Sequence, residues 1–394
     1  MKIAGRVFIK KDRDGLVRGG NPWIFSQAIA KIEPAELVAG DGVEVFDIGG
    51  ERLGFGYFNP ATTIAVRMLA FGDRIEPAHI VQYRIRRAFE LRQRIISPDT
   101  NCYRLINGDG DALSGVVIDC YRDIVVLQLL TAGADRMRPE IVDALQELLA
   151  PRAVIERSYG AVRRQEGLAD QVGVLAGEST GPTAVTENGI ELLVDCEHGQ
   201  KTGYFLDQRD NRALLGELAR GARVFDGYCY LAGFALAALR GGAKQVVAAD
   251  TSARALEGAR RNFDLNRWAP QCYQLVHGEA GHYLGQGAEH FDIVVLDPPP
   301  LARSLKDAPR AAHLYTELNR AAIRAVAEGG FLMTFSCSVH LRGEDFLRAV
   351  RLAAARAGRN FRLIRRLGPG ADHPTMLGHG EGEYLTGLLL ADMA

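Results

Sequence analysis

The second half of the chain alternates short apolar runs with helix-length segments, and this rhythm constrains the fold more than any other feature. The runs lie at residues 223–225, 245–249, 291–296 and 330–335, and helical patterns such as 253–266 and 314–327 lie between them. Continuous apolar strands separated by helices predict a doubly wound parallel sheet, because both faces of such a sheet are buried. Two last runs, 361–367 and 383–390, have no helix between them, which predicts an antiparallel edge.

The first 72 residues follow a different pattern, of β-prone runs punctuated by Gly and Asp. Runs such as 43–46 and 63–69 lie between turn sequences, as in a small β-barrel.

Residues 73–185 combine both patterns and predict a central α+β domain. We expect a helix from about Pro77 to Ile96, two strands around a turn, another helix and a closing loop, at residues 115–119, 124–129, 139–149 and 177–183. The predicted domains are therefore 1–72, 73–185 and 186–394.

Composition places few limits on function. The 394 residues are 47% hydrophobic and 24% charged, as in ordinary globular proteins, and the net charge of −1 excludes a generally basic nucleic-acid coat. No apolar run approaches the roughly 18 residues of a membrane span, and residues 1–6 do not begin a secretory signal. We therefore expect a cytoplasmic protein.

Six cysteines occur without any CxxC pair, so we expect neither a zinc knuckle nor a dithiol redox motif, and no metal. In a reducing compartment most should be buried thiols. Cys337 is the exception, for the reasons given below.

Acidic residues follow the apolar runs in succession. Asp226, Asp250, Glu279 and Asp297 stand at or near the ends of four predicted strands. Ligands of open α/β sheets bind beyond the carboxyl ends of the strands, and Asp250, 24 residues after Asp226, suits a ribose diol. The acids could also be ordinary strand-end caps, but their repetition favours a cofactor site.

A nicotinamide dehydrogenase is the competing interpretation. It would need a GxGxxG loop for a pyrophosphate, whereas here Tyr228 and Tyr230 stand between Gly227 and Gly233. S-adenosylmethionine has no phosphate and carries a cationic sulfonium, which a carboxylate such as Asp226 favours.

The chain resembles the bacterial 23S ribosomal RNA cytosine-5 methyltransferase I family over nearly its full length. The segments that carry the resemblance are Asn21–Ser26, Tyr103–Asp111, Ile155–Ser158, Gly199–Arg209 and Ser336–Ser338. The resemblance implies an N-terminal PUA domain that binds RNA, a central domain and a Rossmann-like class I methyltransferase domain. It also implies S-adenosylmethionine as cofactor, 23S ribosomal RNA as partner and a possible homodimer.

The resemblance assigns cofactor contacts to residues at the strand ends and in the Gly199–Arg209 segment: Asp226, Gly227, Tyr228, Asp250, Thr251, Ser252, Glu279, Ala280, Asp297, Phe205, Gln208 and Arg209. The last three could instead belong to an ordinary helix-entry loop with Lys201 and Arg209 at the surface. The chain departs from the family pattern where Ala232 replaces a glycine, Glu279 an aspartate, and Pro300 a lysine.

Cys337 and Asp297 are the predicted catalytic residues. Carbon 5 of cytosine is a weak nucleophile, and addition of a thiolate to carbon 6 activates it. Cys337 follows an apolar strand and lies between Ser336 and Ser338, so we expect it in the same crevice as Asp297, whose carboxyl could hold the base at N3 and the amino group. The alternative for Cys337 is a buried structural thiol.

Three basic clusters are candidates for RNA phosphates, although each could be a solvated face. One lies in residues 1–18, one on the helix at 84–94, and one in 348–366, where arginines occur without an acid. The predicted RNA contacts are Lys10, Lys11, Arg13, Arg18, Arg84 and Arg87.

Two other functions remain open. The chain could methylate another RNA base, such as guanine N7 or an exocyclic amine. Amino-group methyltransferases commonly place a stacking aromatic after an Asp-Pro-Pro or Asn-Pro-Pro sequence. Here Pro300 and then Leu301 follow, which disfavours methylation of an exocyclic amine. The chain could also be a non-catalytic RNA-binding factor in ribosome assembly, although such a factor needs no nucleophile.

Overall fold

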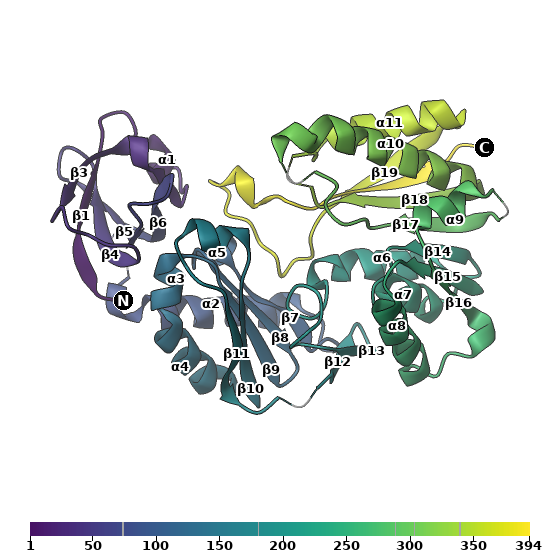
Figure 1. The fold of residues 1–394 in the computed structure, drawn as a ribbon, viewed down its shortest axis with the longest axis horizontal. Coiled ribbons are helices and arrows are strands. Elements are labelled where there is room, and N and C mark those ends of the chain that lie inside the picture. Colours follow the sequence, from purple (N-terminus) through teal and green to yellow (C-terminus); the bar gives the residue numbers. More distant parts are fainter. Residues whose placement is uncertain (73–74, 180, 288, 303, 339) are drawn as a thin grey trace. The chain divides into compact units, whose positions relative to one another are not determined.

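The computed structural model describes residues 1–72, 75–179, 181–287, 289–302, 304–338 and 340–394, which divide into two compact units (Figure 1). The first unit contains Met1–Val185, Val194–Leu206 and Ala371–Gly382, and the second contains Thr186–Leu193, Asp207–Gly370 and Glu383–Ala394. In the part of the chain that the model describes, none of the helices combines the length and apolar character needed to cross a bilayer.

The N-terminal part of the first unit is a β-sheet with strand order β2-β6-β5-β4-β1-β3. Its elements are β1 (Ile3–Ile9), α1 (Gly15–Arg18), β2 (Trp23–Phe25), β3 (Ile29–Glu33), β4 (Asp41–Phe46), β5 (Arg52–Phe58) and β6 (Ile64–Phe71). Inward-facing residues such as Val7, Val43 and Val66 are fully buried and form one core. The β-rich character predicted for this region is confirmed.

The rest of the first unit is a second sheet with helices, in the strand order β11-β10-β9-β8-β7. It contains α2 (Ile80–Ile95), β7 (Cys102–Asn107), β8 (Val116–Tyr121), β9 (Ile124–Leu129), α3 (Ala132–Arg136), α4 (Arg138–Leu149), β10 (Ala153–Ser158), α5 (Ala161–Gln165) and β11 (Gln171–Gly177). The predicted helices and hairpin are present, although α2 begins after a 3₁₀ turn at Pro77–His79. The predicted loop at 177–183 contains residue 180, which lies outside the described residues.

A ribbon of β12 (Thr183–Glu187) and β13 (Ile190–Val194) precedes the main body of the second unit. The elements that follow are α6 (Arg209–Leu218), β14 (Arg223–Gly227), α7 (Gly233–Arg240), β15 (Gln245–Asp250), α8 (Ala253–Leu265), β16 (Tyr273–His277), α9 (Ala280–Gly285), β17 (Phe291–Leu296), α10 (Ala308–Ala325), β18 (Val326–Ser336), α11 (Glu344–Ala357), β19 (Phe361–Leu367) and β20 (Thr386–Asp392).

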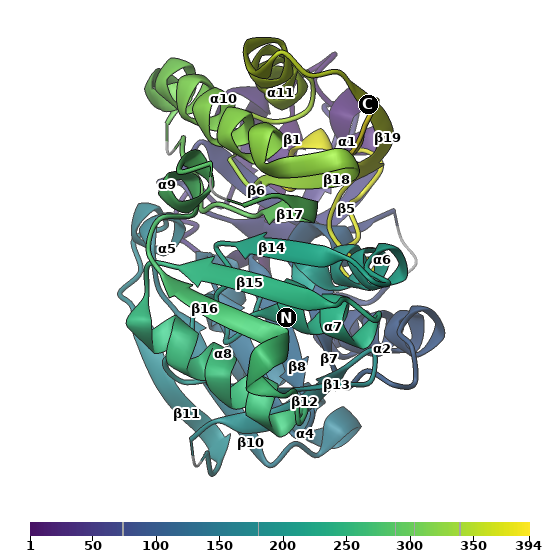
Figure 2. The same ribbon diagram turned by 90° about the vertical axis from the view of Figure 1, so that its right-hand side faces the viewer.

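The second unit is the predicted doubly wound sheet, with strand order β16-β15-β14-β17-β18-β20-β19 (Figure 2). Strands β14 to β18 pair in parallel, and β20 pairs antiparallel with both β18 and β19. Both the parallel sheet and its antiparallel edge are therefore confirmed. The central strands are almost wholly buried, as continuous apolar runs require.

Helices α7 and α8 pack on β14 to β16, and α6 packs on α7. Helices α9, α10 and α11 pack on one another, and their apolar side chains form one core with residues of β17, β18 and β20 (Figure 1). The two sets of helices leave the carboxyl ends of β14, β15, β17 and β18 at one edge of the sheet.

Element boundaries differ from the sequence pattern at two places. Helix α10 begins at Ala308 instead of 314. It directly follows a 3₁₀ turn at Leu305–Asp307, which a capping box between Ser304 and Asp307 starts, and Pro309 in its own first turn favours the early start. It ends at Ala325, where Val326 opens β18. The last strand begins at Thr386, three residues later than its apolar run.

Candidate active site

Asp226 is a buried carboxylic acid at the end of β14. Its Oδ2 accepts a hydrogen bond from the Ala235 amide at 3.0 Å, while its buried Oδ1 has no partner among the described residues. Burial raises the pKa of Asp226 to about 7, and the neighbouring carboxylates of Asp297 and Asp250 act in the same direction. A buried acidic oxygen without a partner, beside two other acids, would favour a cationic ligand.

The loop after β14 has a strained backbone. Tyr228, Tyr230 and Ala232 have φ values of 66°, 48° and 60°, in the left-handed region that non-glycine residues seldom adopt. Gly227 is tightly enclosed, because a Cβ there would lie 3.1 Å from atoms of both Ala280 and Leu296. Such strain is typical of ligand-binding loops.

Tyr228 links this loop to the end of β16. Burial raises the pKa of Tyr228 to about 12, and the Glu279 carboxylate contributes to the shift. Glu279 itself is exposed at the start of α9, and Ala280 is buried beside Gly227. Gly227, Tyr228, Glu279 and Ala280 thus lie close to one another at the ends of β14 and β16.

Asp250, at the end of β15, holds the same loop in place. Its carboxylate accepts hydrogen bonds from the amides of Tyr230 at 2.9 Å and Ser252 at 2.8 Å. Ser252 caps α8 through Ala255, so its hydroxyl has a structural role, and Thr251 is exposed. Asp250 keeps further lone pairs for a ligand.

Cys337 and Asp297 stand at the carboxyl ends of neighbouring strands. Strands β17 and β18 pair in parallel with Leu296 opposite Thr334, and each residue follows its strand directly. The Cys337 thiol donates to the Pro298 carbonyl at 3.6 Å and is half-buried. The other cysteines are buried thiols apart from half-buried Cys272.

The Gly199–Arg209 segment is divided between the two units. Phe205 lies in the first unit, where the Lys201 ammonium stacks 4.4 Å from its ring centre. Gln208 and Arg209 lie in the second unit and are both buried, so the interpretation of Arg209 as a surface residue is wrong. Gln208 accepts from Asn211 at 2.6 Å, and its buried Nε2 has no partner in the described part of the chain.

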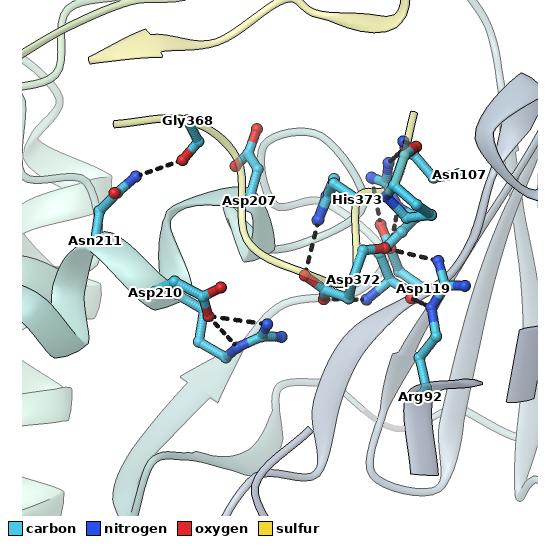
Figure 3. Close-up of polar contacts among 12 residues, drawn as sticks. Arg92, Asn107, Asp119, Asp207, Asp210, Asn211, Gly368, Asp372 and His373 are labelled. Atoms are coloured by element: carbon cyan, nitrogen blue, oxygen red, sulfur yellow. Dashed lines mark hydrogen bonds and ion pairs between the residues drawn. The ribbon is translucent and has the colours of Figure 1, made fainter. Parts of the chain in front are cut away.

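Asp207 and the residues after it are fixed to the C-terminal part of the second unit. The Tyr384 hydroxyl donates to Asp207 at 2.7 Å. Asn211 donates to the Gly368 carbonyl at 2.9 Å (Figure 3). Arg209 pairs with Asp210 at 3.0 Å. The sequence pattern missed Asp207 and Tyr384, because they lie 177 positions apart.

A buried polar network in the first unit was also missed. Arg92 is almost fully buried and forms a bidentate pair with Asp111, and it also donates to the Asp372 carbonyl (Figure 3). Arg104 pairs with Asp119, while its amide donates to the Asp372 carboxylate. Arg92 is one of the arginines of the basic cluster predicted at 84–94. Its inclusion in an RNA-binding face is wrong, because the side chain is buried and its charge is paired with Asp111.

The predicted RNA contacts differ in their surroundings. Lys10, Lys11 and Arg13 are exposed, and Lys10 donates to the Gln27 carbonyl. Three acids surround Arg18: Asp14, Asp47 and Glu51. Arg84 is half-buried against the Leu69 carbonyl, and Arg87 pairs with Glu90.

Most arginines of the 348–366 cluster also have acidic partners, although the cluster itself contains no acid. These partners come from other parts of the second unit and include Glu317, Glu344, Asp345 and Asp392.

Comparison with known proteins identifies the family. A PUA-like domain model matches residues 7–71, and an S-adenosylmethionine-dependent methyltransferase model matches residues 144–377. Ribosomal RNA large subunit methyltransferase I of Alteromonas mediterranea is 38% identical and covers 98% of both chains. The Escherichia coli protein of the same name is 37% identical over 97% of this chain and 98% of its own. The chain belongs to the ribosomal RNA large subunit methyltransferase I family.

Solved structures share the fold. A candidate S-adenosylmethionine-dependent methyltransferase from Streptococcus mutans has a TM-score of 0.82 at 21% identity, covering 99% of this chain and 100% of its own. A methyltransferase crystallised with SAH has a TM-score of 0.83 at the same identity and coverage. Family membership confirms the predicted fold, with its PUA-like N-terminal domain, and the cofactor S-adenosylmethionine.

The residues at the sheet edge fit this cofactor. S-adenosylmethionine carries a sulfonium and an ammonium group, and it supplies an electrophilic methyl group. The unpaired Oδ1 of Asp226 and the unpaired Nε2 of Gln208 offer a buried acceptor and a buried donor. Polar atoms left unpaired inside a protein cost free energy, and a bound ligand removes that cost.

Proposed function

We propose that this protein methylates carbon 5 of a cytosine in large-subunit ribosomal RNA, with S-adenosylmethionine as methyl donor and Cys337 as nucleophile. The observation that carries the proposal is a half-buried thiol and Asp297 at neighbouring strand ends, beside the buried Asp226 carboxyl, whose Oδ1 has no partner among the described residues. The RNA class rests on the names of the relatives, which are ribosomal RNA large subunit methyltransferases.

In the proposed mechanism, Cys337 adds as a thiolate to carbon 6 of the cytosine. The new sulfur–carbon bond moves electron density to carbon 5, which takes the methyl group as the sulfonium–methyl bond breaks. A base then removes the proton from carbon 5, and loss of the thiolate restores the aromatic ring. Cys337 ends the cycle unchanged, so the net exchange is one methyl group for one proton.

Asp297 has the second role in this mechanism. Its carboxyl, one residue beyond β17, is proposed to bind the cytosine at N3 and the amino group. This contact orients the base and favours protonation of N3 while the thiolate adds. A cytosine must leave its stack to reach Cys337 at the strand ends.

We propose cofactor contacts along the same edge. Asp226, Gly227 and Tyr228 would line the methionine part, Asp250 with Thr251 and Ser252 the ribose, and Glu279 with Ala280 the adenine. Gln208 and Arg209 would bind polar atoms of the cofactor, and the contact of Phe205 stays a prediction from the family resemblance.

Lys10, Lys11 and Arg13 are the strongest candidates for RNA phosphates, because all three are exposed. Arg18 and Arg87 are paired with acids, and Arg84 is half-buried against a backbone carbonyl. The possible homodimer and the cytoplasmic location remain predictions from the resemblance and the composition.

The mechanism can be tested by trapping the covalent complex. Large-subunit RNA that contains 5-fluorocytidine has no proton to lose at carbon 5, so methyl transfer should leave the protein attached to the RNA. We expect a complex that resists denaturant with the wild-type chain and S-adenosylmethionine, and none with Cys337→Ala or without cofactor. Cys272→Ala is the matched control and should trap normally. An equal yield from Cys337→Ala would exclude the nucleophile.

A further inference from the structure

Ser338 joins the segment that carries Cys337 to the loop that carries Asp297. Its Oγ accepts hydrogen bonds from the amides of Leu301 at 3.0 Å and Ala302 at 3.2 Å, four and five residues beyond Asp297. The Ser338 side chain is fully buried. Ser338 Oγ therefore uses both of its lone pairs to accept these two hydrogen bonds.

Tyr315 of α10 contacts the Ser338 side chain. Its hydroxyl lies 3.3 Å from Ser338 Oγ, within hydrogen-bond distance. Burial raises the pKa of Tyr315, and the charges of Cys337 and Asp297 act in the same direction, so the phenol is neutral. The ring is held edge-on against Phe346, with 5.2 Å between centres.

The direction of each hydrogen bond follows from counting donors. Because Ser338 Oγ already accepts two amide hydrogens, its own hydrogen must go to the Tyr315 oxygen. Ser336 Oγ donates to the Leu341 carbonyl at 2.8 Å and accepts from the Ser338 amide at 3.3 Å. The loop amides, Ser338 and Tyr315 therefore form one chain of hydrogen bonds.

We propose that Ser338 and Tyr315 are positioning residues, which hold the Asp297–Ala302 loop at a fixed distance from Cys337. The same contact keeps the Pro298 carbonyl within 3.6 Å of the Cys337 thiol. This inference rests on the proposed function for its effect on methyl transfer. The effect on the Cys337 thiol is independent of it.

The first test measures the thiol directly in the full-length chain. Cys337 and Cys272 are the half-buried cysteines, so iodoacetamide should label both, and the ratio of their labelling rates can be read by peptide mass spectrometry. We expect Tyr315→Phe and Ser338→Ala to raise the Cys337 to Cys272 ratio by about threefold to tenfold, the effect of losing one hydrogen bond.

Thr316→Val is the matched control. Thr316 is the next residue of α10, is equally buried, and bonds to Ala312 and to Ala349 of α11 instead of the loop. Its loss removes a buried hydroxyl from the same helix, so it should cost stability without changing the labelling ratio. A ratio for Tyr315→Phe that matches wild type, or that matches Thr316→Val, would overturn the proposal.

The second test measures methyl transfer. A misplaced loop should lower kcat by about tenfold to a hundredfold while the KM for S-adenosylmethionine stays within about twofold. Because the two hydroxyls act as one chain, the double variant should be no slower than the slower single variant. Additive losses, or a rise in the cofactor KM alone, would exclude a shared positioning role.

The two proposals fail in distinguishable ways. If Cys337→Ala still makes 5-methylcytidine, the nucleophile is wrong, whereas the labelling ratio continues to report on the loop. If Ser338→Ala does not fold, Tyr315→Phe decides the question, since it keeps the ring and its packing against Phe346.

Discussion

At the scale of the residue, Asp226 is a carboxyl group whose pKa differs strongly from its value in water. The sequence predicted an acid at this strand end, but its protonation state depends on burial and on two neighbouring carboxyls, which come from separate strands. With a pKa of about 7, the acid is only partly ionised near neutral pH in the ligand-free protein. A bound cationic ligand would favour the ionised carboxylate and so lower the pKa of Asp226.

Asp226→Asn should therefore change how stability depends on pH. The folded pKa is raised from 3.8 to about 7, so the stabilising proton is fully present below about pH 4 and is lost as pH rises towards 7. Relative to wild type, the free energy of unfolding of the variant should increase by about 2–4 kcal/mol between pH 5 and pH 8. Urea unfolding at several pH values measures this difference, and parallel curves would contradict the raised pKa.

Cofactor binding should release a proton from the same carboxyl. At pH 6.5 Asp226 is mostly protonated in the ligand-free protein, and the positive charges of S-adenosylmethionine favour the carboxylate. Calorimetry in two buffers of different ionisation enthalpy should show a release of about half a proton or more, falling towards zero at pH 8.5. Binding of Asp226→Asn should be weaker, and any binding it retains should release no proton from this position.

At the scale of the element, the sequence predicted the sheet better than the site. Continuous apolar runs identify β14, β15 and β17 because parallel strands are buried on both faces. The same pattern does not predict side-chain contacts between segments that lie far apart in the sequence. Asp372 contacts Arg92 and Arg104 across more than 260 residues, and Tyr384 reaches Asp207, so these contacts exist only once the chain is folded.

Helix α6 is attached to β12 by a buried ion pair. Arg212 of α6 and Glu187 of β12 form two hydrogen bonds of 2.6 Å, and both side chains are almost wholly buried. Arg212→Ala should lower the free energy of unfolding by about 3–5 kcal/mol, because Glu187 is left buried without its partner. Thermal or urea unfolding measures this loss. Arg212→Met with Glu187→Leu should recover most of it, and failure to recover would point to packing instead of charge.

At the scale of the whole molecule, the chain does not finish the first unit before it builds the second. Residues 371–382 return to the first unit, between strands β19 and β20 of the second. Within the first unit they pack closely, since a Cβ at Gly110 would lie 1.9 Å from the Pro374 carbonyl oxygen. The order of elements along the sequence gives no sign of this return.

Gly110→Ala should therefore destabilise the first unit. The added methyl must displace the backbone at Pro374, which should lower the free energy of unfolding by about 1–3 kcal/mol in urea. Gly15→Ala is the control, because a Cβ there meets nothing within 4 Å. Equal free energies of unfolding for the two variants would show that residues 371–382 move to accommodate the added methyl group at little cost.

The central claim is methylation of a cytosine at carbon 5, and nucleoside mass spectrometry tests it most directly. The purified chain is incubated with unmodified 23S ribosomal RNA and methyl-labelled S-adenosylmethionine, and the digested RNA is analysed for labelled nucleosides. We predict labelled 5-methylcytidine with the wild-type chain and its loss with Cys337→Ala. Label on guanosine or on an exocyclic amine would contradict the role of Cys337. A lack of label on both naked RNA and ribosomal particles, with cofactor bound, would indicate an RNA-binding factor instead.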